Sequence, residues 1–217
     1  MLLASLSSAP VMAEEEQQVW QAQHVDDTSS GVLEVGVAAG VAPMYMGSDD
    51  YTGMVAPFLS YRRGGFFIGG LDGIGYAHQG KNGFLASVAL NYDPGRTDNK
   101  ETHGYWDARG SEDLNGMGRI KGSAVLLLGL SQPVAPWMTL DAEADIRIAG
   151  QRKRGNGYRL GFTVLPYQRD DTQLSVGLRA YLADENYSQT YFGVSDQQSL
   201  RSGHPVFQAE RGLRPGR

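Results

Sequence analysis

The sequence predicts an all-β protein, built as an antiparallel transmembrane β-barrel of the outer-membrane type with about nine strands. Three observations support this fold. Apolar and polar residues alternate along most of the chain, no run of 18 apolar residues is present, and the connections between alternating segments sort by length. A period of two places the two kinds of side chain on opposite faces of a strand. A membrane protein without long apolar segments must be a closed barrel, because lipid cannot satisfy unpaired backbone groups.

The segment 138–148 shows the alternation most clearly. Every even-numbered residue in it is apolar and every odd-numbered residue is polar. A helix would scatter these carboxylates around its circumference, whereas a strand gathers them on one face. Roughly 9–11 tilted residues are enough for a strand to cross a bilayer. The polar face suits a wet barrel interior, although the polar face of a soluble sheet would have the same pattern.

The first half of the barrel is predicted from five segments that end in turn residues. The second segment ends at Arg62-Arg63-Gly64-Gly65, and the third ends before an Asp-Gly turn at 72–73. Glycine weakens the fourth segment, and Lys81-Asn82-Gly83 after it predicts a tight hairpin. The five segments are 33–41, 54–61, 66–70, 74–79 and 84–92.

The second half is predicted from four longer alternating segments. Two prolines lie in the connection at 132–136, and Arg-Asp-Asp-Thr forms the turn at 169–172. The four segments are 120–131, 138–148, 158–164 and 174–182.

The connections between these nine segments are of two kinds. Short ones are expected at 62–65, 80–83, 132–136 and 169–172, and long ones at 42–53, 93–119, 149–157 and from 183 onward. The turn at 71–73 is the exception. In an up-and-down arrangement the short connections share one end of the barrel, which is how outer-membrane barrels with short periplasmic turns are built.

The chain is expected to have three parts. Residues 1–13 resemble a partial signal peptide, with a short apolar core and a small-residue cleavage site but no basic residue before the core. A floppy N-terminus is the alternative. Residues 14–30 are polar, acidic and without a period, which predicts a disordered periplasmic lead-in. Residues 31–217 form the barrel domain.

Composition argues against several classes of function. The net charge of −5 gives no basic footprint for nucleic acid. The absence of cysteine excludes disulfides and thiolate metal sites, and the four histidines are too scattered to suggest a metal site. No catalytic constellation stands out, so we expect a protein that is not an enzyme and needs no cofactor.

A set of charged residues is predicted to face the lumen from neighbouring strands. Two of the acids lie one strand repeat apart and could imitate a glycosidase pair, but a wet lumen with arginine partners explains them more simply. Such a wall would tune which solutes enter if the barrel has a pore. The set is Asp141, Glu143, Asp145, Arg147, Arg159 and Arg179.

A second basic group, Arg152-Lys153-Arg154, falls in a predicted outer loop. There it could bind lipopolysaccharide phosphates through charge-assisted pairs, or it could simply be solvated.

Four stretches of the chain resemble the MipA/OmpV family of outer-membrane proteins, named for an interaction with the murein lytic transglycosylase MltA. The first is Val37 to Tyr51, which is similar to the family's opening strand and its Pro-x-Tyr-x-Gly-Ser loop. The other three are 66–70, 72–76 and 189–194, and the resemblance covers about 33 to 213. The residues of the motif loop are Pro43, Tyr45, Gly47, Ser48, Asp49 and Tyr51.

The resemblance implies an outer-membrane barrel that scaffolds murein synthases and lytic transglycosylases. Its partners would then be membrane lipid and lipopolysaccharide, a lytic transglycosylase and a penicillin-binding protein. The sequence departs from the family at its end, where an aromatic terminal strand is expected. Nine strands is an odd number, so we expect a truncated copy that lacks about three strands, since bacterial barrels have even numbers.

Two other functions stay open at this point. One is a channel or ligand-binding outer-membrane barrel that admits small polar solutes through the charged lumen. The other is a soluble lipocalin-like barrel, which requires the apolar faces to point inward.

Overall fold

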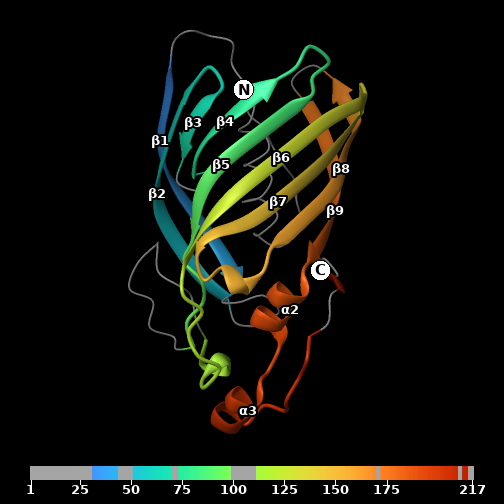
Figure 1. Cartoon of the computed structure of the whole chain (residues 1–217). Helices are drawn as coiled ribbons and strands as arrows, with labels where there is room; N and C mark the ends of the chain where they lie inside the picture. Colours follow the sequence, from blue (N-terminus) through green and yellow to red (C-terminus); the bar gives the residue numbers. More distant parts are fainter. Residues whose placement is uncertain are drawn as a thin grey trace.

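The protein forms one antiparallel sheet of ten strands, in which each strand pairs with the next in chain order (Figure 1). The computed structural model describes residues 31–43, 51–69, 73–98, 111–169, 172–209 and 212–214. The expected leader and lead-in, residues 1–30, lie outside the described residues. The strands are β1 (Val32–Pro43), β2 (Tyr51–Arg63), β3 (Phe66–Gly69), β4 (Gly73–Gln79), β5 (Leu85–Asp93), β6 (Ser123–Ala135), β7 (Met138–Gly150), β8 (Gly157–Arg169), β9 (Thr172–Ala183) and β10 (Gly212–Arg214).

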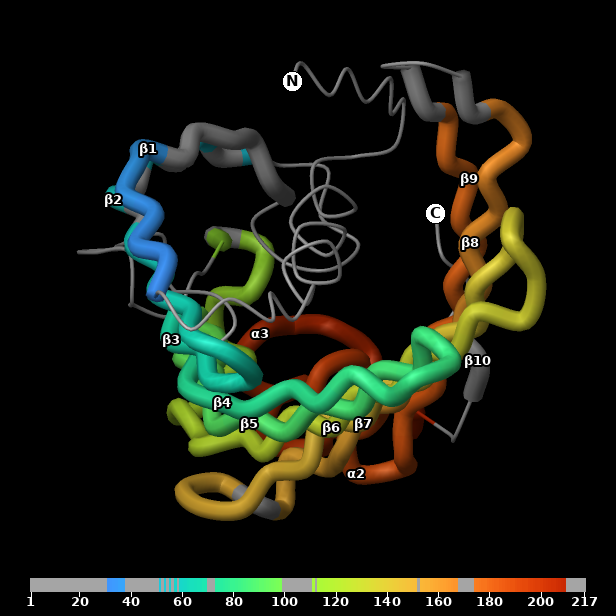
Figure 2. Tube along the Cα trace, turned by 90° about the horizontal axis from the view of Figure 1, so that it is seen from above, coloured from blue at the N-terminus to red at the C-terminus, as the bar shows by residue number. Residues whose placement is uncertain are grey.

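The sheet curves into an open C when it is viewed from above (Figure 2). β1 and β10 form its two edges, and they do not pair with each other within the described residues. The prediction of an all-β antiparallel fold is confirmed, and its nine segments correspond to β1 through β9. The short strand β10, which pairs with β9 over three residues, was not predicted.

Two short helices after β9 were also missed. α2 spans Glu185–Phe192 and α3 spans Asp196–Ser202. Both are too short to show a helical period, but α3 carries a local signal. The Ser195 side chain accepts from the backbone of Gln198, and the Gln198 side chain returns the bond, which makes a capping box.

The two faces of the sheet differ in chemistry as the alternation predicts. The apolar side chains of one face are exposed, with Val37 at 74% and Leu178 at 65%. The other face carries small or polar side chains, and Ser60, Ala77, Ala89 and Ser123 on it are buried. We call the exposed set the outer belt; it comprises Leu33, Val35, Val37, Val55, Leu59, Phe66, Ile68, Ile74, Tyr76, Val88, Leu90, Leu128, Leu130, Leu140, Tyr158, Leu160, Leu174, Val176 and Leu178.

Apart from the three-residue connection between β3 and β4, the connections separate by length onto the two ends of the sheet (Figure 1). The turns that join β2 to β3, β4 to β5, β6 to β7 and β8 to β9 are short. The β4–β5 turn closes at Gly83, whose φ of 74° favours glycine. The opposite end carries the long connections, with the 3₁₀ turns η1 (Glu112–Leu114) and η2 (Arg152–Arg154) and the helices.

No helix in the described part of the chain has both the length and the apolar character needed to cross a membrane.

Candidate functional site

Charged side chains on the inner face of β7 and β8 neutralise one another. Arg159 lies directly opposite Glu143 in the strand register and forms an ion pair with it. The same guanidinium donates to the Asp145 carboxylate at 2.9 Å. Both acids therefore share one arginine. A glycosidase needs one carboxyl group as acid and a separate carboxylate as base or nucleophile, and this shared ion pair does not provide that arrangement.

Asp141 has a different set of neighbours on this face. Its carboxylate accepts a hydrogen bond of 2.9 Å from the Ser131 hydroxyl on β6. On the other side it is opposite Gly161, which is in turn opposite Arg179 on β9. A Cβ at Gly161 would come within 2.8 Å of the Arg179 side chain, so the glycine makes room for the arginine. Five of the six predicted lumen residues thus lie close together on β7 to β9.

Arg147, the sixth, belongs to a second group at the end of the barrel with the long connections. A register shift against β6 follows it, where Val125 faces Arg147 and Ala124 faces Ala149. Its guanidinium is buried and donates to the Asp93 carboxylate at 2.9 Å and to the Gly155 carbonyl at 2.6 Å. Arg147 therefore keeps the inward phase of β7, and the β-bulge changes the pairing only of the residues that follow it.

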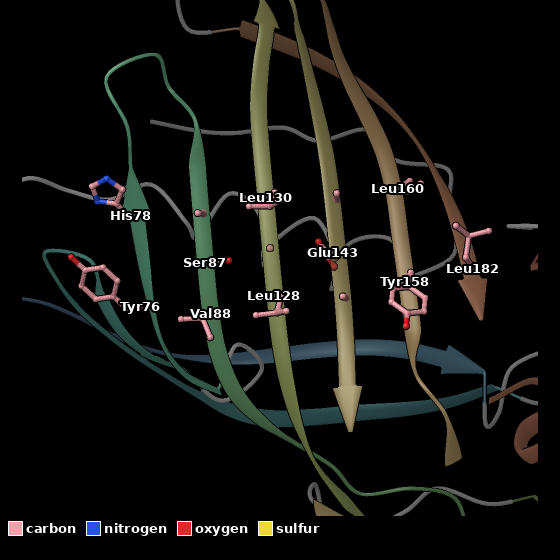
Figure 3. Close-up of a pocket in the computed structure, with 14 residues that line it drawn as sticks. Tyr76, His78, Ser87, Val88, Leu128, Leu130, Glu143, Tyr158, Leu160 and Leu182 are labelled. Carbon is pink, nitrogen blue, oxygen red and sulfur yellow. The ribbon is translucent and has the colours of Figure 1, made fainter. Parts of the chain in front are cut away.

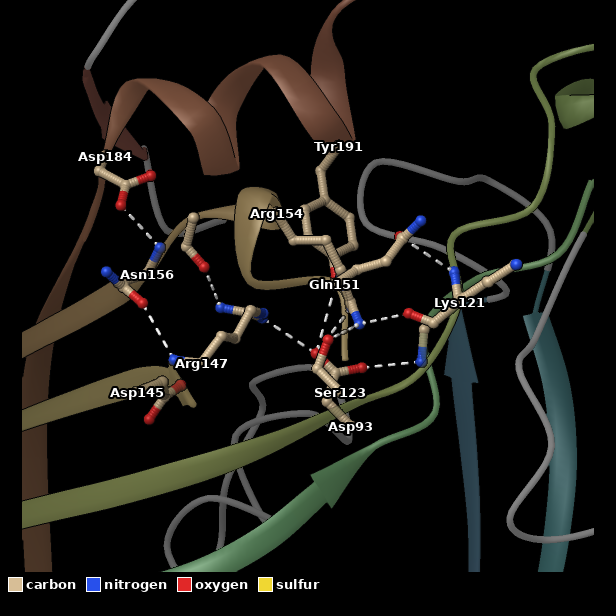
Figure 4. Close-up of polar contacts among 12 residues, drawn as sticks. Asp93, Lys121, Ser123, Asp145, Arg147, Gln151, Arg154, Asn156, Asp184 and Tyr191 are labelled. Atoms are coloured by element: carbon tan, nitrogen blue, oxygen red, sulfur yellow. Dashed lines mark hydrogen bonds and ion pairs between the residues drawn. The ribbon is translucent and has the colours of Figure 1, made fainter. Parts of the chain in front are cut away.

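Arg154 is the centre of this group (Figure 4). The residue is only 2% exposed. Its guanidinium donates to Asp93 at 2.8 Å, to the Lys121 carbonyl at 2.9 Å and to the Ser123 hydroxyl at 3.1 Å. It also contacts the Tyr191 hydroxyl on α2. One carboxylate, Asp93, therefore holds two buried arginines.

Helix α2 closes over these arginines with two aromatic rings. Arg147 lies 5.2 Å from the ring centroid of Tyr187, and Arg154 lies 5.4 Å from that of Tyr191. Burial raises the pKa of the Tyr191 phenol, and Asp93 adds to this, whereas Arg154 acts in the opposite direction. Burial lowers the pKa of Arg154, but Asp93 and the Tyr191 hydroxyl together outweigh it, so that the pKa is raised. Arg154 therefore keeps its charge over the whole physiological pH range.

Asp184 positions α2 against the hairpin that carries Arg154. One carboxylate oxygen caps the helix by accepting from the Tyr187 backbone N–H, and the other accepts from the Asn156 N–H at 2.7 Å. Gly155 is required between them, because its φ is +78° and a Cβ would come within 2.0 Å of the Asp184 carboxylate.

The second helix rests on the β5–β6 connection. Gln198 on α3 donates to the Met117 carbonyl at 2.7 Å, and the His204 ring contacts the Asp113 carbonyl at 3.1 Å. Leu114, Met117 and Ile120 are buried in the same connection. We call residues 111–120 and 184–209 together the loop-end cap.

The remaining predicted residues are only partly placed. Pro43 ends β1 opposite Tyr51, the exposed first residue of β2. Tyr45, Gly47, Ser48 and Asp49 lie outside the described residues. Neither alternative for the basic triplet, lipopolysaccharide contact or a solvated loop, holds for Arg154, whose guanidinium is buried among its own partners. Lys153 beside it is exposed.

Sequence reasoning missed Asp93, Asp184 and Tyr191. Asp93 and Tyr191 are 98 positions apart, and no local pattern connects them. The only available signal was the position of Asp184 before a possible helix start. Within the described residues, no three His, Cys, Asp or Glu side chains come together in a way that could hold a metal ion.

Comparison with known proteins gives one match. Residues 35–217 match the family model described as "MltA-interacting protein MipA". No curated protein and no solved structure matches the chain. Because the match spans most of the chain, including every strand after the start of β1, this protein belongs to the MipA family.

Proposed function

We propose that the protein is an outer-membrane β-barrel that serves as a docking scaffold for murein-processing enzymes, a lytic transglycosylase of the MltA kind and a penicillin-binding protein. The outer belt is the observation that carries the membrane part of the proposal. The partner rests on the description of the family, which names an interaction with MltA and no reaction.

The outer belt supports a lipid environment because of its extent. Soluble monomers rarely expose a contiguous apolar patch above a few hundred Å². Here large apolar side chains are exposed on every strand from β1 to β9, and several of them are directly opposite one another, as between β4 and β5, β5 and β6, and β8 and β9. The soluble lipocalin-like alternative requires the opposite arrangement, with these side chains inside the barrel.

The distribution of connections suggests which end meets the partner. Outer-membrane barrels place their short turns in the periplasm. A murein-bound enzyme would then meet the short-turn end, where Trp137 is 57% exposed and Lys81 and Asn82 are also exposed. The loop-end cap would face the cell exterior.

The cysteine-free chain allows a direct test of membrane location, orientation and docking. Asn82→Cys marks the short-turn end, and Asn115→Cys marks the loop-end cap as a matched control, since both side chains are exposed. After outer-membrane fractionation, a membrane-impermeant maleimide should label the Asn115 variant in intact cells and the Asn82 variant only in permeabilised cells. A thiol-linked photo-crosslinker at position 82, but not at 115, should capture the lytic transglycosylase. Capture from neither position would refute the scaffold.

A channel is the second candidate, because the inner wall carries the Glu143–Arg159–Asp145 ion pairs. Steady single-channel conductance of the wild type in liposomes, with an ion selectivity that differs in the Arg159→Met variant, would favour the channel over the scaffold.

A further inference from the structure

Two exposed lysines lie on neighbouring connections at the loop end of the sheet. Lys121 comes two residues before β6, and Lys153 is in η2, shortly after β7. Within the described residues, neither lysine is in an ion pair. The group beside them is also cationic, because the Asp93 carboxylate is shared by Arg147 and Arg154. The whole chain is acidic, so this excess of positive charge is a local feature.

Hydrogen bonds fix the two connections against each other (Figure 4). The Lys121 backbone N–H donates to the Gln151 side chain at 3.3 Å, and the Lys121 carbonyl accepts from the Arg154 guanidinium at 2.9 Å. The Arg154 backbone N–H closes η2 by donating to the Gln151 carbonyl at 3.1 Å. Lys153 lies within this turn, so the two lysines are held on adjoining backbone segments. The buried arginine therefore positions two exposed cations.

A tyrosine connects this end with the outer belt. Tyr92 has the same phase on β5 as Leu90 of the belt, and it is 55% exposed. A Cβ at Gly122 would come within 2.0 Å of the Tyr92 hydroxyl, so this hydroxyl lies against the backbone next to Lys121. Tyrosine is enriched at the boundary between lipid and water, because its ring is apolar and its hydroxyl is polar. The outer face therefore places a hydroxyl beside the first lysine.

The outer face below this end is apolar. Figure 3 shows this face between β4 and β9, with Val88 and Leu128 on it. On β7 the same face continues at Ile146, beyond Asp145, which is the last residue of β7 that pairs with β8. An amphiphile with its anionic head at the two lysines can therefore keep its chains on the same strands.

We propose that Lys121 and Lys153, together with the Tyr92 hydroxyl, bind a phosphate group of lipid A in the outer leaflet. The proposal rests on the proposed function, which places the belt in the outer membrane and the loop end at the cell exterior. Lipid A is the occupant because it combines phosphate groups with acyl chains on that side of the membrane. The lysines supply charge-assisted hydrogen bonds to the phosphate, and the belt supplies the contacts for the chains.

The first test uses the full chain in nanodiscs and an amine-reactive reagent, with peptide mass spectrometry as the readout. Bisphosphorylated lipid A should protect Lys121 and Lys153 from modification, relative to a nanodisc of phosphatidylcholine. Lys81 is the control within the same molecule, because it is exposed at the short-turn end and meets the same lipid in the opposite leaflet of a nanodisc. Its reactivity should not change. Equal reactivity of Lys121 and Lys153 in the two nanodiscs would overturn the proposal.

The second test measures retained lipid A by native mass spectrometry after mild detergent extraction. K121M/K153M should retain at least about tenfold less lipid A than wild type, since each lysine adds to the attraction at the surface. Y92F, which removes one hydroxyl, should show a smaller loss, and K81M should match wild type. Equal retention of phosphatidylglycerol and lipid A by wild type would overturn lipid A as the occupant.

Outer-membrane fractionation of the same proteins separates this proposal from the proposed function. If wild type and K121M/K153M both fractionate with the outer membrane and retain lipid A equally, the site is refuted and the membrane location stands.

Discussion

Replacement of Arg154 by methionine should release the loop-end cap from the barrel. The side chain is buried and bonds to Asp93, the Lys121 carbonyl and the Ser123 hydroxyl at the strand ends. It also contacts the hydroxyl and the ring of Tyr191 on α2, so it ties the cap to these strand ends. Methionine fills similar volume but leaves these acceptors unsatisfied. Breaking a buried ion pair costs about 3–5 kcal/mol.

The lower end of that range applies here. In the variant, the Asp93 carboxylate is still paired with Arg147, and its side chain is 27% exposed, so its charge is not left buried without a partner. We therefore expect about 3 kcal/mol of lost stability for closure of the cap. Since about 1.4 kcal/mol corresponds to a tenfold change in an equilibrium constant, the open population should rise by roughly two orders of magnitude.

Trypsin provides the assay, because Arg201 on α3 is the only lysine or arginine between residues 184 and 209. When closing is fast relative to cleavage, the cleavage rate follows the open population. Cleavage after Arg201 should accelerate in Arg154→Met, as measured by intact mass, while the heat-modifiable gel shift of the barrel persists. The control is Lys153→Met, which removes an exposed neighbouring cation. Equal cleavage rates in wild type and Arg154→Met would refute the reasoning.

A backbone variant tests the same closure without touching a charge. In Gly155→Ala the new methyl group would meet the Asp184 carboxylate and the Tyr187 N–H, and the residue would be held at φ +78°. Strain of this kind costs on the order of 1–3 kcal/mol. Cleavage after Arg201 should again accelerate, whereas Gly64→Ala should leave it unchanged, because Gly64 is also at positive φ with open space around it but lies in the β2–β3 turn.

Three further predictions concern the wall, the belt and the cap. Arg159→Met leaves Glu143 and Asp145 without their shared cation and should lower the free energy of unfolding in micelles by about 2 kcal/mol, between the values for exposed and buried pairs; an unchanged urea midpoint would contradict this. Leu178→Arg places a charge on the most exposed large apolar side chain of β9 and should weaken folding into vesicles by about 2–4 kcal/mol, measured by urea titration. Equal folding of the variant and the wild type would argue against lipid contact. The pKa of Tyr191 is raised in the folded protein, so above pH about 10 the phenol ionises in the unfolded chain before it does so in the folded protein. The free energy of unfolding should therefore fall as the pH rises above about 10. The Tyr191→Phe variant should show a smaller fall in unfolding experiments at high pH.

The sequence alone determined the strands and their faces. Alternation is a property of neighbouring residues, and the side-chain period of a strand does not depend on its partners. The segment 138–148 therefore predicted both the position of β7 and the separation of its charges from its apolar residues. Gly83 likewise marked the β4–β5 turn, because its requirement for positive φ is local.

Only the tertiary structure decided which charges meet. Arg147 has the same phase as Glu143 and Asp145, but it lies nearer the end of β7, where Asp93 at the end of β5 is the acid within reach. From the sequence, Arg154 is a loop residue that contacts either lipopolysaccharide or solvent. Its burial depends on α2, because the Tyr191 ring of this helix lies against its guanidinium. These features depend on pairs far apart in the chain, and periodicity along one strand carries no information about its partner's register.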